Sequence, residues 1–138
     1  METKLYELLP KEAKQVREEV FIKEQGFLSD DDDIDKISTH FVTFDKEVPV
    51  AACRIYPAKK DGEYVLGRLS VLRICRGKGV GKIIYNEAEK HIKNIGGKKI
   101  ILQAQYRVKD FYSSLGFSEY GEIEYEEGCA LIWMSKNL

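Results

Sequence analysis

The sequence has few of the features that mark membrane, disulfide-stabilised or metal-binding proteins. No apolar run approaches the roughly 18 residues needed to cross a bilayer, and the first four residues carry no apolar signal region. The three cysteines are widely separated, with no paired spacing, so neither a disulfide framework nor a zinc site is indicated. We therefore expect a cytoplasmic protein that holds no metal ion.

An excess of charge of one sign is also missing. The 22 Lys and Arg residues balance 23 Asp and Glu residues, which gives a formal net charge of −1 at pH 7. This balance provides no overall attraction to nucleic acid or to an anionic membrane, so neither is expected as a partner. With 138 residues, 43% of them hydrophobic, the chain is expected to form one domain, residues 1–138, around a single core.

The most informative segment is the run Arg76-Gly77-Lys78-Gly79-Val80-Gly81-Lys82. It follows a β-rich segment, residues 64–72, and opens an amphipathic helical pattern over residues 80–95. Glycine at every second position lets the backbone turn sharply and bring its N–H groups close to a ligand. The start of the helix adds free N–H groups and the positive end of its dipole. The segment therefore predicts a phosphate-binding loop.

Spacing excludes two common phosphate loops. A Walker-type loop needs Gly six positions before its Lys and Ser or Thr after it, but those positions hold Arg76 and Ile83. The third glycine of a dinucleotide fingerprint would fall at Lys82, and no suitable acidic residue follows about 20 positions on. Taken alone, the loop could also be an ordinary strand–turn–helix junction.

Three segments resemble one family. Arg76-x-x-Gly79-x-Gly81 resembles the Arg/Gln-x-x-Gly-x-Gly/Ala signature of the GNAT superfamily of N-acetyltransferases, whose loop holds the pyrophosphate of acetyl-coenzyme A. Residues 105–117 resemble the family's second landmark, a strand end followed by a short helix with Phe-Tyr and a closing Gly-Phe. The pattern Arg17-x-x-Val20-Phe21-x-x-Glu24-Gln25, followed by Ser38-x-His40-Phe41, is similar to the ElaA-like branch.

The resemblance implies an α/β fold, a single GNAT-like domain whose mixed, mostly antiparallel central sheet is flanked by helices and splayed at its central strands to hold acetyl-CoA. Hydrophobic periodicity predicts the order β-α-β-β-β-α-β-α-β-β. The expected strands are residues 4–8, 41–45, 48–56, 64–72, 99–104, 117–120 and 130–134, and the longer helices lie around residues 13–21 and 80–95. The acidic run of residues 30–35 is expected to be a solvated loop.

The resemblance also implies a function and a binding site. It implies direct transfer of an acetyl group from acetyl-CoA to a primary amine of a small molecule or a protein, in a ternary complex. A non-catalytic acyl-CoA-binding module is the alternative, and a homodimer stays open. The expected cofactor-binding residues are Leu69, Ser70 and Val71, through their backbone, and Arg76, Gly77, Lys78, Gly79, Val80, Gly81, Lys82, Gln105 and Tyr112.

Catalytic residues are harder to assign. In the family, the tyrosine at the position of Tyr112 protonates the departing thiolate, although a tyrosine here could also simply pack. The strand position at which some members carry a glutamate holds Val65, and Glu63, two residues earlier, is the candidate base. Glu24 and His40 are candidate substrate-binding residues, with a surface or structural role as the other interpretation. A water-mediated route needs no side-chain base.

Other positions depart from the family pattern or leave choices open. Gln105 replaces the usual Asn, which leaves its cofactor contact open, and Arg73 replaces a common Pro. Cys75 is expected to be a small filler, because a covalent mechanism would need a partner histidine. Acidic residues at 30–35 and 122–127 would attract cationic acceptors if they face the site, or else serve solubility.

Overall fold

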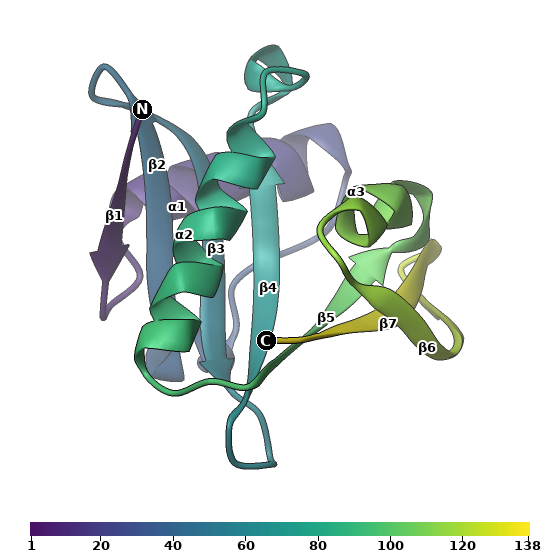
Figure 1. The fold of residues 1–138 in the computed structure, drawn as a ribbon. Helices are drawn as coiled ribbons and strands as arrows, with labels where there is room; N and C mark the ends of the chain where they lie inside the picture. Colours follow the sequence, from purple (N-terminus) through teal and green to yellow (C-terminus); the bar gives the residue numbers. More distant parts are fainter.

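The computed structural model describes residues 1–138, which form one seven-stranded sheet with helices on both faces (Figure 1). The strands are β1 (Glu2–Tyr6), β2 (Thr39–Asp45), β3 (Val48–Pro57), β4 (Glu63–Val71), β5 (Lys99–Gln105), β6 (Ser118–Glu126) and β7 (Cys129–Asn137). The helices are α1 (Lys11–Arg17), the π-helix η1 (Glu18–Glu24), the 3₁₀ segments η2 (Asp33–Ile37), η3 (Arg73–Cys75) and η4 (Tyr106–Val108), α2 (Val80–Asn94) and α3 (Lys109–Ser114).

The sheet is mixed and mostly antiparallel, as predicted. Its strand order is β1-β2-β3-β4-β5-β7-β6, and only the β4–β5 pair is parallel. α2 is the connection that makes this parallel pair possible, since a parallel crossover needs a dozen or more residues. Ile84, Ala88 and Ile92 of α2 recur every four residues and are fully buried against the larger core. On the opposite face, Ala13 and Val16 of α1 pack in a smaller core.

The central strands separate partway along their length. β4 pairs with β5 only where Glu63–Leu66 runs beside Lys99–Leu102. Beyond that point β4 continues to Val71, while the end of β5 pairs only with β7. Figure 1 shows β5, β6 and β7 leaning away from β4. The splayed sheet implied by the resemblance is therefore confirmed.

β4 also carries a bulge at its point of separation. Ala52 pairs with Ser70 and Arg54 with Gly67, so that one residue of β3 stands opposite two of β4. Arg68 lies in the bulge with φ at +54°, a left-handed conformation that costs a non-glycine residue about 1–2 kcal/mol. Bulges re-aim side chains, and this one lies just beyond Leu66, where the pairing of β4 with β5 ends while the pairing with β3 continues.

The structure corrects the prediction for the acidic run. Asp30 and Asp35 are only 6% exposed, and residues 33–37 form η2 rather than a solvated loop. The prediction was wrong because it treated the aspartates alone, whereas arginines distant in the sequence neutralise them. The last two strands are also longer than predicted and form one hairpin with its turn at Glu127 and Gly128.

Candidate active site

A cavity of about 620 Å³ occupies the space between the diverging strands. Small-molecule sites have volumes of about 300–1,000 Å³. The cavity extends from α2 and α3, on one face of the sheet, to the end of η1 on the other. Of the predicted site residues, those that line it are Leu69, Ser70, Val71, Arg76, Gly77, Gly79, Val80, Gly81, Lys82, Gln105 and Tyr112. The structure thus gathers most of the predicted cofactor residues around one space.

The glycine-rich loop presents free backbone donors to this cavity. Gly77 and Gly79 have φ values of +76° and +79°, which explains why glycine is needed at both positions. None of the backbone N–H groups from Gly77 to Lys82 donates to a backbone carbonyl. Gly79 caps α2 without a side-chain hydrogen bond, so the first turn of the helix keeps its donors for a ligand.

The loop is tied to the π-helix by a salt bridge. Both terminal nitrogens of Arg76 donate to the carboxylate of Glu24, at 2.6 and 2.7 Å, and its Nε donates to the carbonyl of Val71. The hydrogen bonds from Arg76 lower the pKa of Glu24, and the same bonds raise the pKa of Arg76. Arg73 also lies 3.5 Å from Glu24. Glu24 therefore contacts the loop, and it lines a shallower depression beside the cavity rather than the cavity itself.

The free edge of β4 provides a second binding element. From Gly67 to Val71 the strand has no partner on the side of β5. An unpaired strand edge is a template for an extended, hydrogen-bonding ligand. Leu69, Ser70 and Val71 lie on this edge and line the cavity. They would bind a ligand through their backbone groups, so their side chains need no particular functional group.

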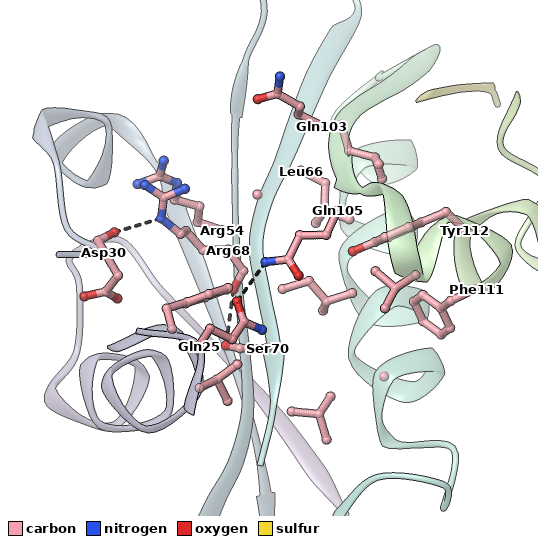
Figure 2. Close-up of a pocket in the computed structure, with 18 of the residues that line it drawn as sticks. Gln25, Asp30, Arg54, Leu66, Arg68, Ser70, Gln103, Gln105, Phe111 and Tyr112 are labelled. Carbon is pink, nitrogen blue, oxygen red and sulfur yellow. Dashed lines mark hydrogen bonds between the residues drawn. The ribbon is translucent and has the colours of Figure 1, made fainter. Parts of the chain in front are cut away.

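Tyr112 projects from α3 toward the middle of the cavity (Figure 2). It is 9% exposed and packs edge-on against Phe111 and Phe117. Burial, with a smaller contribution from the nearby Cys53 thiol, raises the pKa of Tyr112 well above its ordinary value. The hydroxyl therefore stays protonated and can act as a proton donor but not as a base.

A pair of glutamines links the end of β5 to the end of η1. Gln105, at the end of β5, donates to Gln25, just beyond η1, at 2.8 Å (Figure 2). Both residues line the cavity. Gln25 belongs to the N-terminal sequence pattern, but that pattern assigned it no role. Only the fold, which joins residues 80 positions apart, indicates one.

The other end of the cavity is bounded by a buried ion network. Arg17 is 2% exposed; its Nε donates to Asp30 at 2.7 Å, and its two terminal nitrogens donate to Asp35. Arg54 donates to Asp35 and Asp32. Burial by itself would raise the pKa of Asp35, but the hydrogen bonds from Arg17 and Arg54 outweigh it and hold this pKa well below its usual range. The N-terminal sequence motif contains Arg17, but no pattern in the sequence indicated that Asp30 and Asp35 are its partners.

The remaining candidates lie away from this cavity. Glu63 begins β4, in the paired part of the strand, and does not line the cavity. His40 is fully buried on β2 and shares a hydrogen bond with the carbonyl of Asp35 at 2.9 Å. Burial lowers the pKa of His40 despite this carbonyl. His91 stacks edge-on against Phe41 instead of approaching Cys75, which does line the cavity. The structure therefore does not bring Glu63 or His40 together with Tyr112.

No helix is long and apolar enough to span a membrane. No group of three or more His, Cys, Asp or Glu side chains is placed to hold a metal ion.

Comparisons with known proteins agree with this geometry. A model of the acetyltransferase (GNAT) domain matches residues 10–138. The uncharacterized N-acetyltransferase YjcF of Bacillus subtilis (strain 168) is 39% identical over an alignment of 117 residues that covers 83% of this chain and 82% of YjcF. Protein ElaA of Escherichia coli (strain K12) is 30% identical over an alignment of 141 positions, gaps included, that covers 99% of this chain and 89% of ElaA.

Solved structures share the fold. The crystal structure of E. coli ElaA superposes with a TM-score of 0.86 at 27% identity and covers 98% of both chains. An aminoglycoside 6'-N-acetyltransferase complexed with coenzyme A superposes with a TM-score of 0.78 at 16% identity, covering 99% of this chain and 97% of that one, and shows likeness of fold alone. The match to the domain model over nearly the whole chain, supported by relatives that share sequence as well as fold, shows that this protein belongs to the GNAT family of acetyltransferases.

Proposed function

We propose that the protein transfers the acetyl group of acetyl-CoA directly to a primary amine, with both substrates bound at once. The observation that carries the proposal is the opening between β4 and β5, which joins the free N–H groups at the start of α2 to Tyr112 and continues to the other face of the sheet. Two substrates can enter such a passage from opposite faces and meet at its centre. GNAT enzymes use acetyl-CoA, and the residues here fit it.

The fit rests on the loop and the strand edge. Free N–H groups from Gly77 to Lys82, with the α2 dipole and the Lys82 side chain, suit the pyrophosphate of the cofactor. The unpaired edge of β4 suits the amide-bearing arm that follows it. When bound, the cofactor supplies an acetyl group activated as a thioester.

Tyr112 would hold the proton that the departing sulfur needs. Its phenol stays protonated because burial disfavours the phenolate. A thiolate formed in the same buried space is disfavoured for the same reason, so donation by Tyr112 lowers the cost of its departure. The phenol then regains a proton from water, which takes up the proton that the attacking amine loses, so that no buried phenolate persists. Holding amine and thioester together supplies much of the remaining acceleration, since orientation can contribute about 7–11 kcal/mol.

Deprotonation of the amine needs no residue at the position of Glu63. The carboxylates that line the cavity are those of Asp30, Glu126 and Glu127, and Asp30 is bound to Arg17. We infer that the amine binds in its neutral form or loses its proton to water, as a side-chain base is not required for either route.

The experiment is a thiol-release assay with acetyl-CoA and a panel of primary amines, with mass spectrometry of the amine products. We expect free CoA and an acetylated amine to form in equal amounts. Binding of acetyl-CoA by calorimetry without turnover of any amine would contradict it and favour a non-catalytic acyl-CoA-binding module.

A further inference from the structure

The bulge in β4 turns Arg68 toward the α1 face of the sheet. Leu66 and Leu69 both pack with the core on the α2 face, although regular alternation would place residues three apart on opposite faces. The bulge adds one residue to β4, and this shifts the alternation of side chains so that both leucines face the same side. Arg68 consequently contacts Asp30 and Asp32 on the α1 face, at the end of the cavity away from the glycine-rich loop.

Arg68 has donors that the protein does not use. Its Nε donates to the carbonyl of Asp30 at 2.7 Å, and one terminal nitrogen makes a long contact of 3.3 Å with Asp32. The other terminal nitrogen, Nη1, has no hydrogen-bond partner. The side chain is 34% exposed and lines the cavity, so these donors are accessible. The protein thus holds Arg68 in place through Nε and Nη2 and leaves Nη1 without a hydrogen-bond acceptor.

Three arginines, Arg17, Arg54 and Arg68, balance the three carboxylates nearby. Asp30 and Asp35 bind Arg17, and Asp35 and Asp32 bind Arg54. Figure 2 shows the guanidinium groups of Arg54 and Arg68 lying close together beside Asp30. Burial, followed by the charge of Arg54, lowers the pKa of Arg68 even though Asp32 and Asp30 act in the opposite direction. An anion bound at Arg68 would accept a hydrogen bond from its free Nη1, which no group of the protein uses.

We propose that the acceptor amine carries an oxyanion, a carboxylate or a phosphate, at a distance from its amino group, and that Arg68 binds this oxyanion. The guanidinium fork matches both groups. This inference rests on the proposed function and adds the class of acceptor. It replaces attraction of cationic acceptors by the acidic run, whose Asp30, Asp32 and Asp35 are paired with arginines; only Glu126 and Glu127 still bring exposed negative charge to the cavity.

The test compares amines of similar length that differ in the group at the far end. With saturating acetyl-CoA, 4-aminobutanoate and 3-aminopropyl phosphate should have a kcat/KM about tenfold or more above that of butylamine. The better of the two anionic amines identifies the oxyanion. Equal values for butylamine, or faster turnover of putrescine, would overturn the assignment and leave the proposed function intact.

Variants assign the effect to Arg68. Arg68→Gln should raise KM for the anionic amines about tenfold and leave that of butylamine unchanged. Arg107→Gln removes a positive charge from another part of the cavity wall and should not discriminate between the amines. An equal loss of preference in both variants would contradict a specific role for Arg68.

A binding measurement separates this inference from the proposed function. Calorimetry of 4-aminobutanoate added to the CoA-loaded protein should give heat of binding in the wild type that Arg68→Gln lacks. If no amine is turned over but this heat is observed, the oxyanion site stands and the acetyl-transfer proposal fails. Absence of binding to the wild type would overturn the oxyanion site.

Discussion

The two ends of the cavity are built from different parts of the chain. At the α2 end the free donors are the backbone N–H groups of six consecutive residues, Gly77 to Lys82, whose conformation depends on glycines. At the α1 end the cavity wall carries the side chains of Arg54 and Arg68, which aspartates from a separate segment hold together with the buried Arg17. If, as proposed, the first end binds the pyrophosphate and the second binds the acceptor, single substitutions at the second end can change acceptor specificity without disturbing the cofactor site.

The largest effect on stability is expected from loss of Arg17 at the α1 end. Arg17→Met would leave Asp30 and Asp35 buried without their main cationic partner, and we expect the free energy of unfolding to fall by about 3–5 kcal/mol in urea denaturation. Lys36→Met removes an exposed cation of η2 that pairs with Asp33, and should leave it nearly unchanged. A loss in Arg17→Met no larger than in this control would mean that the network does not hold the α1 end together.

Acid should reveal the same network. The pKa values of Asp32 and Asp35 are lowered in the folded protein, so their contribution to stability is complete above their ordinary value near 3.8 and is lost as the pH falls below it. The wild type should therefore be less stable at pH 3 than at pH 6, and Arg17→Met should show a smaller difference between the two. Equal pH dependence in the two proteins would contradict this assignment.

The centre of the cavity is tested by Tyr112→Phe. Removal of the hydroxyl should lower kcat about 100-fold, as expected for loss of a general acid, while acetyl-CoA binding changes little. Phe111→Leu, which alters packing beside Tyr112 but removes no donor, is the matched control. Unchanged kcat in Tyr112→Phe would show that this side chain only packs.

One added negative charge should weaken phosphate binding at the α2 end. Asn and Asp both tolerate the positive φ of Gly79, and a Cβ there would meet no atom within 4 Å. Gly79→Asp places a carboxylate among the phosphate-binding N–H groups and should weaken CoA binding about tenfold more than Gly79→Asn, by calorimetry. Equal affinities in the two variants would mean that the pyrophosphate lies elsewhere.

The smallest effect concerns Glu24, which contacts the loop from the other side of the sheet. Glu24→Gln should weaken CoA binding only a few-fold, because the salt bridge with Arg76 is partly exposed. Its acceptor KM distinguishes two roles. A change in the amine KM with unchanged CoA affinity would support the substrate-binding role predicted from the sequence and contradict the role in holding the loop.

The same difference between the ends explains what the sequence could predict. The loop, the splayed sheet and Tyr112 follow from contiguous motifs, in which glycine spacing reports a backbone conformation directly. The network at the α1 end depends on residues 13 to 38 positions apart, and no local pattern announces that Arg17 will neutralise Asp30 or that Arg68 will reach it. Glu63 was chosen by strand alternation, which says which face a residue occupies but not how far along the strand the opening begins.

The central claim is that both substrates occupy the passage between β4 and β5 together and react directly. Initial rates measured over a matrix of acetyl-CoA and amine concentrations test it most directly. Direct transfer predicts double-reciprocal lines that intersect, in the wild type and in Cys75→Ser alike, because Cys75 lines the cavity without a histidine beside it. Parallel lines, lost together with activity in Cys75→Ser, would indicate an acyl-enzyme and contradict direct transfer.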